Sequence, residues 1–345
     1  MECNGRLTRW LIAALVIPAI LSSSLFAFAG GLTPEPLGAE AFLSGVTPPG
    51  EAFVIKEYID YYTAKKLETN HGYGINHTVS LKTEGYALDK LQVIDFTTRF
   101  IYISPLKLSV AGLDGYLIGH AIIPAANSRI KLDLPTDQSD HHTGVGDITL
   151  GPSIGWHTEN GLFHFITAVD ITAPTGQWDP KGLVNVGNNV WSVSPIIAAT
   201  LFLPWHPNLE FDIKMDYSFN SRNDDYIING PTAAKIGNKG LVGVRTDLTP
   251  GQDFHVDYAI AYALSKTGAE HQFRAGATGY FYKQTTDDET TAGRVKNNLG
   301  EVFAIGPGVW WTYKHWIAEA RVDYEIEARN RPQGINSWLT ILYKF

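Results

Sequence analysis

Histidine and aspartate side chains gather in one polar stretch of the chain, between residues 137 and 147. Asp137, Asp140, His141, His142 and Asp147 have the residue types of a metal site, because imidazole nitrogens and carboxylate oxygens are ligands that zinc takes. The stretch is also typical of a surface loop, in which neighbouring histidines are simply solvated. The sequence favours the second interpretation, and we expect neither a resident metal nor another cofactor.

Hydrolytic chemistry has little support in the sequence. No His-Glu-x-x-His motif occurs, the spacing that puts two zinc ligands on one face of a helix, and nothing singles out one serine as a nucleophile. We therefore predict no catalytic residues and a protein that is not an enzyme.

Charged residues instead recur at every second position of several segments. Residues 209–220 alternate apolar side chains with Glu210, Asp212, Lys214 and Asp216, and residues 316–328 have the same alternation. A period of two predicts a β-strand with one apolar and one charged face. A soluble sheet turns its charged face outward, whereas a barrel in lipid needs an apolar outside and a polar interior.

The chain ends on such a strand. Ile341, Tyr343 and Phe345 share one face, and the last residue is aromatic. This ending resembles the C-terminal signal of bacterial outer-membrane barrel proteins, which implies contact with the barrel-assembly machinery during biogenesis. A soluble β-protein that happens to finish on phenylalanine is the alternative.

The N-terminus predicts export. Residues 1–29 begin with Arg6 and Arg9, continue with a short apolar run, and end in Ala27-Phe28-Ala29, the pattern of a cleaved secretory signal. Cys3 lies in this signal, so the mature chain has no disulfide. Residues 30–50 are rich in Gly and Pro and form a periplasmic N-terminal segment, either a flexible leader or a partial plug of a barrel mouth.

Charge and hydropathy exclude two classes of protein. Without Glu2, Arg6 and Arg9, the 27 basic and 35 acidic residues become 25 and 34, a formal charge of −9. This charge disfavours nucleic acid as a partner. No run of eighteen apolar residues follows residue 29, so membrane-spanning helices are not expected.

Residues 51–345 predict a transmembrane antiparallel up-and-down β-barrel of about twelve strands, an all-β fold. Short connections near residues 105, 159, 205, 267 and 314 alternate with long ones near 75, 133, 181, 236 and 291, and the last, near 331, is short again. This sorting of connections is typical of outer-membrane barrels. The expected strands are 53–63, 91–103, 113–123, 145–157, 162–172, 190–202, 209–219, 254–264, 272–283, 302–313, 316–328 and 337–345, with a further short strand at 77–82.

If the apolar faces meet lipid, the opposite faces line the lumen. The expected lumen-lining residues are Lys56, Asp60, Asp95, Arg99, Glu210, Asp212, Lys214, Asp216, Asp253, Asp257, Arg274, Tyr280, Tyr282, Glu319, Arg321, Asp323, Glu325 and Glu327. The charges can pair across strands and stiffen a wet interior, or they can form a path for cations or neutral solutes. Tyr280, Tyr282 and Trp338 can stack on an aromatic solute, or simply pack.

Several segments carry a family resemblance. Pro36-Leu37-Gly38-Ala39-Glu40, Pro48-Pro49-Gly50, residues 58–65 and 279–284, Asp287-Asp288, Ile305-Gly306-Pro307-Gly308 and residues 329–334 resemble the SphA-like family, described as "meta-pathway of phenol degradation" proteins. The resemblance covers the mature chain. It implies an outer-membrane barrel, similar in concept to the long-chain fatty acid transporters, that takes up aromatic or other hydrophobic compounds.

The resulting prediction is a passive channel in the outer membrane of a Gram-negative bacterium, in contact with outer-membrane lipid and with a small hydrophobic or aromatic solute. One alternative is a structural or adhesive barrel whose long loops, above all residues 221–251, bind a partner outside the cell. A hydrolase with a Ser/His/Asp arrangement at the barrel rim is a further alternative.

Overall fold

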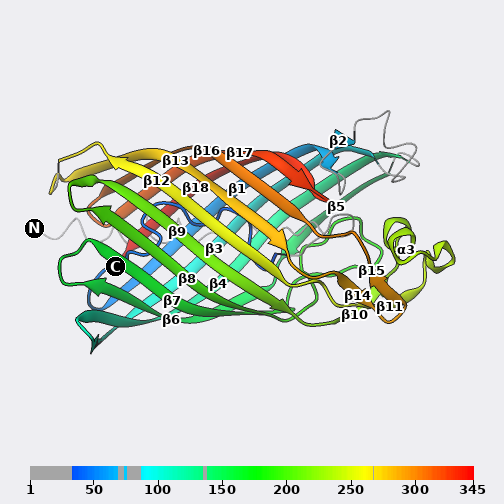
Figure 1. Ribbon diagram of the computed structural model, residues 1–345, viewed down its shortest axis with the longest axis horizontal. Coiled ribbons are helices and arrows are strands. Elements are labelled where there is room, and N and C mark those ends of the chain that lie inside the picture. Colours follow the sequence, from blue (N-terminus) through cyan, green and yellow to red (C-terminus); the bar gives the residue numbers. More distant parts are fainter. Residues whose placement is uncertain (1–32, 69–73, 76–86, 135–137, 267) are drawn as a thin grey trace, which may run out of the picture.

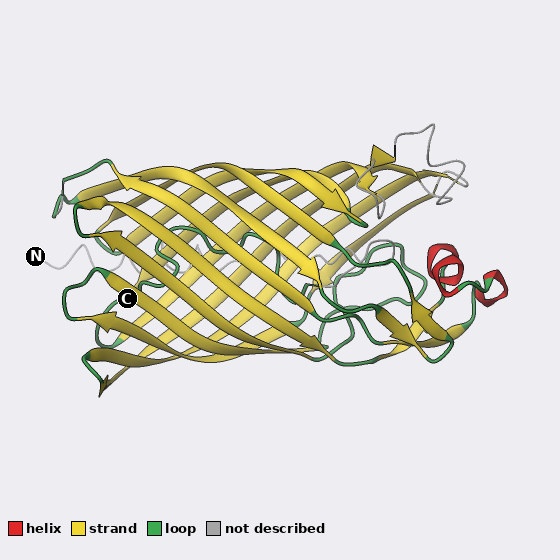
Figure 2. Cartoon of the chain, in the orientation of Figure 1, coloured by secondary structure: helices red, strands yellow, loops and turns green. Residues whose placement is uncertain are grey.

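Twelve long antiparallel strands close into one barrel (Figures 1 and 2). The computed structural model describes residues 33–68, 74–75, 87–134, 138–266 and 268–345. Each long strand pairs with its neighbours along the chain, and the last pairs back onto the first, so the sheet has no open edge. This topology confirms the predicted all-β, up-and-down barrel.

The long strands are β1 (Ala52–Glu68), β3 (Ala87–Val110), β4 (Leu113–Leu134), β6 (Ile148–Thr158), β7 (Phe163–Ala173), β8 (Ser192–Leu203), β9 (His206–Asn220), β12 (Asp253–Ala263), β13 (His271–Gln284), β16 (Glu301–Tyr313), β17 (Trp316–Arg329) and β18 (Pro332–Lys344). The shorter elements are β2 (Gly74–Ile75), β5 (Gln138–Val145), β10 (Asn223–Ile227), α3 (Gly230–Ile236), the 3-10 helix η1 (Lys239–Leu241), β11 (Arg245–Leu248), β14 (Asp288–Thr290) and β15 (Gly293–Val295).

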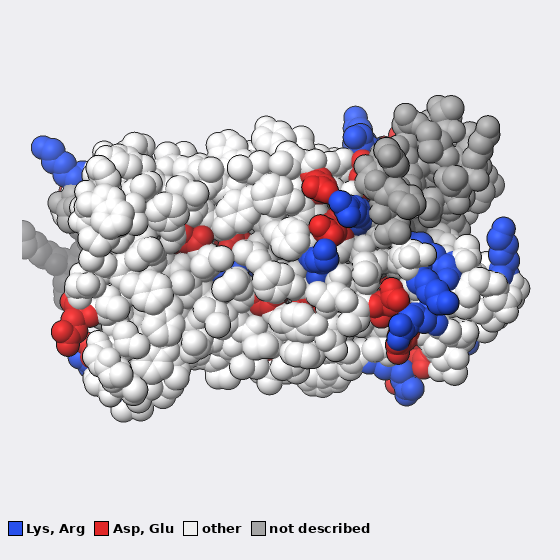
Figure 3. All heavy atoms as spheres, viewed as in Figure 1, with Lys and Arg blue, Asp and Glu red and all other residues white. Residues whose placement is uncertain are grey.

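The alternating sequence pattern decides which side of each strand faces inward. On β9 the side chains of Glu210, Asp212 and Asp216 are buried, whereas Phe211 and Phe219 are exposed. Because the sheet is closed, buried alternate residues point into the barrel and exposed ones point away from it. Figure 3 shows the consequence: charged side chains gather mainly toward the two ends, and the flank between them carries mostly other residues.

The two ends of the barrel differ. Short turns join β3 to β4, β6 to β7, β8 to β9, β12 to β13 and β16 to β17, and the C-terminus lies near this end in Figure 1. Ala111 and Gly112 make a two-residue turn in which both have positive φ, 50° and 80°, the backbone that suits a tight hairpin. The opposite end carries the long connections, including α3 and the small sheets β10–β11 and β14–β15.

Two predicted connections are wrong. The chain remains extended through Pro105 to Val110, because a register shift between Ile103 and Lys107 accommodates the proline within β3. The predicted loop 124–143 is largely strand, since β4 continues to Leu134 and β5 pairs with it.

Glu327 was predicted to face the lumen, and this prediction is wrong. Phe303 pairs with Glu327 but its neighbour Ala304 pairs with Glu325, so Ile326 is an extra residue in β17. This β-bulge reverses the alternation. The side chain of Glu327 is 56% exposed and bonds Arg329, whereas Ala328 is buried.

Several predictions fall outside the described residues. These are the signal over residues 1–29, including Cys3, the short strand at 77–82, and Asp137. Within the described part of the chain, none of the helices has the length and apolar character needed to span a bilayer.

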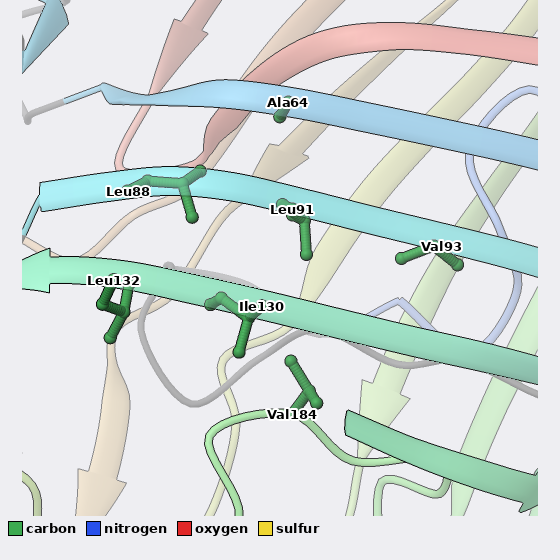
Figure 4. Packing of buried hydrophobic residues seen from close by; sticks show 7 residues of the cluster. All are labelled: Ala64, Leu88, Leu91, Val93, Ile130, Leu132 and Val184. Atoms are coloured by element: carbon green, nitrogen blue, oxygen red, sulfur yellow. The ribbon is translucent and has the colours of Figure 1, made fainter. Parts of the chain in front are cut away.

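Apolar side chains also pack inside the barrel near its long-connection end. Ala64, Leu88, Leu91, Val93, Ile130 and Leu132 come from three adjacent strands, and Val184 reaches them from the connection between β7 and β8 (Figure 4). This packing holds the connection inward, and it lines part of the interior with methyl groups.

Candidate functional site in the barrel interior

Residues 33–50 occupy the barrel interior, where they appear as the blue segment behind the strands in Figure 1. Leu37 packs with Tyr280 and Tyr282, and Phe42 packs with Ala259, Ala261 and Trp310. Leu37 and Phe42 are both buried. The segment therefore contributes its own apolar side chains to an interior in which many wall residues are charged.

The segment runs along the barrel axis. Its start lies near the long connections, where the Asn188 side-chain amide donates to the carbonyl of Thr33 at 3.4 Å. Farther along, the Thr47 hydroxyl bonds His157, beside the short β6–β7 turn, at 3.1 Å. Ser44 and Gly45 contact β8 and β9 between these points. The interior is thus obstructed over much of its length.

The backbone of the segment is bonded by inward-facing side chains. The two carboxylate oxygens of Asp257 accept hydrogen bonds from the N–H groups of Gly38 and Glu40, each at 2.9 Å. Arg321 donates to the carbonyl of Gly38, and Asn336 donates to that of Leu37. The bonds to Asp257 and from Arg321 have a charged partner and belong to the stronger class of hydrogen bond. Together with Asn336, these residues of β12, β17 and β18 hold the segment in one position.

Glu40 connects the segment to the opposite wall. Its carboxylate bonds Lys56 Nζ at 2.6 Å, the Tyr58 hydroxyl at 2.6 Å and Arg99 at 2.9 Å. Burial opposes ionisation, but the ammonium of Lys56 and the guanidinium of Arg99 hold the pKa of Glu40 well below its usual range. Glu40 therefore stays ionised, and both cations have a partner.

A second ionic cluster surrounds His255. Its ring nitrogens lie 3.2 Å from Asp216 and 2.6 Å from Asp257, and Lys214 pairs with Glu35 and, at 3.6 Å, with Asp216. Among the described residues, Glu35, Asp216 and His255 are close enough together to be considered as metal ligands. The ammonium of Lys214 already lies beside the carboxylates of Glu35 and Asp216. Its positive charge disfavours a metal ion at the same place.

The aspartates around residue 140, and His142, have partners within the protein. Asp140 accepts from the N–H of Leu183 at 2.7 Å and lies 3.4 Å from His142. Asp147 accepts from the N–H groups of Gly176 and Asn188. The aspartates therefore fix the β7–β8 connection, which is a structural role.

Apart from Glu327, the predicted lumen-lining residues lie on the inner face. The side chains of Asp95, Glu210, Asp212, Lys214, Asp216, Asp257, Tyr280, Tyr282, Glu319, Arg321, Asp323 and Glu325 are buried, and those of Arg99 and Arg274 are partly buried. The structure brings Arg274 to Glu210 at 2.8 Å and Arg321 between Glu319 and Asp323. Many of these charges thus have an oppositely charged neighbour.

The inner-face aromatic residues are engaged by polar groups. The hydroxyl of Tyr280 donates to Glu325 at 2.9 Å, and the guanidinium of Arg331 lies 4.3 Å from the ring centre of Tyr282. Arg321 lies 5.0 Å from that of Trp338. These contacts fix the orientation of the rings.

The residues of the predicted assembly signal lie at the end of β18. Tyr343 packs edge-on against Phe345, with 4.7 Å between ring centres, and against Trp316. The N–H of Phe345 donates to the carbonyl of Phe53 at 2.8 Å. The terminal residue therefore continues the pairing of β18 with the start of β1.

Sequence reasoning missed several interior residues. His255 lies between Asp253 and Asp257 on the polar face of its strand, and the same period of two could have identified it. Glu35, Glu40 and Phe42 had no such signal, because their contacts depend on the path of an irregular segment. Their position in a Gly- and Pro-rich stretch gave no indication of a partner.

A serine motif was also missed. Residues 151–155 read Gly-Pro-Ser-Ile-Gly, a match to the Gly-x-Ser-x-Gly pattern of hydrolases, which needs a strand-to-helix turn. Here the motif lies within β6. The nearby His120 bonds Asp170 through Nε2 and Arg99 through Nδ1, so neither nitrogen is left for Ser153. The arrangement does not form a catalytic triad.

Comparison with known proteins identifies one family. A family model described as "Putative MetA-pathway of phenol degradation" matches residues 69–341. A search of curated protein sequences finds no match.

Among solved structures, the fold is similar to the COG4313 outer membrane channel from Pseudomonas putida F1, with a TM-score of 0.67 and 15% identity over 89% of this chain and 99% of that one. The transport unit of the autotransporter AIDA-I from Escherichia coli follows with a TM-score of 0.49 and 12% identity, over 88% and 94% of the two chains. The first likeness bears on the fold alone, and the second is too distant to support an argument.

Proposed function

The chain belongs to the "Putative MetA-pathway of phenol degradation" family, and from this premise we propose that it is a passive outer-membrane channel for small hydrophobic or aromatic compounds. The observation that carries the proposal is a closed barrel, apolar outside and charged inside, whose interior is crossed by residues 33–50. The COG4313 outer membrane channel has a similar fold, so a barrel of this kind is compatible with transport.

The obstruction favours passage of one small solute at a time. Interiors of eight-stranded barrels are filled by side chains, and sixteen or more strands leave an open channel, so twelve strands give an intermediate width. Residues 33–50 narrow it further. An unfilled porin would pass ions and solutes in bulk, which this interior disfavours.

The charges of the interior favour neutral solutes or cations over anions. Carboxylates of Asp60, Asp95 and Glu325 face one region of the lumen, and rings of acidic side chains repel anions at close range. A basic ladder, which anion uptake would need, is not part of this arrangement. We infer a path for uncharged compounds.

The proposal includes export and assembly. A signal over residues 1–29 directs the chain across the inner membrane, and the barrel-assembly machinery recognises the ending Ile341, Tyr343 and Phe345. Outer-membrane lipid then covers the apolar flank. No catalytic step and no cofactor is part of the function.

Planar-bilayer recording tests the proposal. The purified protein should give small, discrete conductance steps, and a single-ring aromatic solute should reduce the ion current while it occupies the path. A large steady conductance that the solute does not change would contradict a narrow solute path. No conductance, with or without solute, would favour the adhesive barrel.

A further inference from the structure

A cavity of about 120 Å³ lies inside the barrel, on the long-connection side of residues 33–37. Its walls come from the N-terminal segment, from β1, β3, β4, β13, β17 and β18, and from the connections that precede β6, β8 and β18. Its size is close to that of an engineered protein cavity of roughly 150 Å³ that binds benzene, so it has room for a single aromatic ring.

Much of the wall is apolar. Pro34, Pro36 and Leu37 form one side, and Val93 and Val186 face them from the barrel wall and from the inward connection. Val93 belongs to the methyl-lined region of Figure 4. Such surfaces, with a few polar groups to fix orientation, are typical of small-molecule sites.

Most carboxylates of the cavity already have partners. Glu325 accepts from the hydroxyls of Tyr62 and Tyr280 at 2.8 and 2.9 Å, and Glu35 pairs with Lys214. Asp147 accepts from two backbone N–H groups, and Asp95 accepts from Thr97 at 2.6 Å. Each of these four carboxylates therefore has a hydrogen-bond or ion-pair partner inside the protein.

Asp60 differs from them. Asp60 is only 4% exposed, and its carboxylate oxygen Oδ1 has no hydrogen-bond partner among the described residues. Asp95 lies directly opposite on the neighbouring strand, so a second carboxylate faces the same space. A buried acceptor without a donor is costly, and a ligand that brings a donor would remove this cost.

We propose that this cavity binds a single-ring aromatic compound bearing a hydroxyl group, whose O–H donates to Oδ1 of Asp60 while the ring packs against Pro36, Leu37 and Val93. The inference rests on the proposed function, to which it adds the class of solute and the place of recognition. Arg331 also lines the cavity, but its guanidinium lies over the ring of Tyr282. An aromatic carboxylate therefore still brings its negative charge to Asp60 and Asp95, and it is rejected.

Binding of phenol and anisole to the purified protein tests the inference. The two rings are nearly the same size, but the methyl ether of anisole has no O–H to donate. Calorimetric titration should give phenol at least ten-fold tighter binding than anisole, and no measurable binding of benzoate. Sites built around a hydrogen-bonded hydroxyl discriminate strongly against analogues that lack it.

Two substitutions locate the recognition. Asp60→Ala should bring the phenol-to-anisole ratio close to one, and Asp60→Asn, which keeps the shape and a neutral acceptor, should give an intermediate ratio. Asp170→Asn is the matched control, because this buried carboxylate bonds His120 away from the cavity, and its ratio should equal that of the wild type. The ratio of two affinities in one preparation is insensitive to a partial loss of folded protein.

The position of the ligand can be observed directly. Crystals soaked in 4-bromophenol should show the anomalous signal of bromine in the cavity beside Asp60. Equal affinities for phenol and anisole, an unchanged ratio in Asp60→Ala, or bromine elsewhere would overturn the inference. Conductance steps recorded from the same protein would then still support the channel, so the two failures are distinguishable.

Discussion

Glu40 is where the N-terminal segment is bound to the barrel wall by charge. Replacing it in Glu40→Gln leaves Lys56 and Arg99 without their carboxylate, and hydrogen bonds to charged groups contribute about 1.5–3 kcal/mol each. We expect a segment that is less firmly held and single-channel currents that are several-fold larger and noisier. Because the pKa of Glu40 is depressed, its contribution to stability should be complete at neutral pH. It should decrease as the pH falls below the usual pKa of glutamate, where the unfolded chain takes up a proton, and be lost as the pH approaches the depressed pKa of the folded protein.

The control for this substitution is Glu159→Gln, which changes an exposed residue in the short β6–β7 turn. It should leave the conductance at the wild-type level. Equal conductance for both variants would contradict the role given to Glu40.

Gly38 tests the packing of the same segment. Its φ is 84°, and a Cβ there would lie 2.7 Å from Cδ1 of Tyr280. Gly38→Ala should therefore cost both the left-handed backbone strain, about 1–2 kcal/mol, and a displacement of the buried ring. Faster amide hydrogen exchange over residues 33–47 is the expected result.

Gly50→Ala is a matched control for Gly38→Ala. Gly50 has a φ of 79°, but a Cβ there meets nothing within 4 Å. Gly50→Ala therefore has the same left-handed backbone strain as Gly38→Ala, but its Cβ does not clash with a neighbour. The rate of amide hydrogen exchange over residues 33–47 should change much less. Equal rates of amide hydrogen exchange in the two variants would show that packing against Tyr280 does not hold the segment.

At the scale of single elements, alternation in the sequence was sufficient to predict the long strands. Strand β9 is an example, because Glu210, Asp212, Lys214 and Asp216 all occupy the face that the period of two assigns to them. Irregular positions were not predictable. The bulge at Ile326 depends on how β17 aligns with β16, and a single strand carries no information on its partner's register.

The last element, β18, allows a test of assembly. Phe345 packs against Tyr343 and Phe53 and pairs with the start of β1. Phe345→Ala should lower the amount of folded, heat-modifiable barrel in the outer membrane several-fold. Phe273→Ala is the control, since both side chains are 48% exposed but only Phe345 ends the chain. Equal yields of the two variants would exclude a special role for the terminal residue.

At the scale of the whole molecule, the sequence predicted a closed barrel, its strands and the sorting of its connections. It left open whether residues 30–50 form a leader or a plug, and the reason is physical. Gly38, Glu40 and Leu37 meet side chains that are more than two hundred positions away in the chain, such as Asp257 and Tyr280. Local patterns contain nothing about such pairs.

Removing the inner segment tests its effect on the complete barrel. A chain that lacks residues 33–49 keeps all twelve long strands and loses the obstruction. Its single-channel conductance should rise well above that of the wild type and lose its sensitivity to aromatic solutes. An unchanged conductance in a folded, heat-modifiable barrel would show that ions pass by another route.

The most direct test of the channel is the initial rate of phenol uptake by intact cells at limiting concentration. The rate is compared between a deletion strain and the same strain carrying the gene, with a porin-permeant sugar as the reference solute. We predict slower phenol uptake in the deletion strain, restored by the gene, and equal uptake of the sugar. Equal phenol uptake in the two strains, or an equal loss for phenol and sugar, would contradict the proposed function.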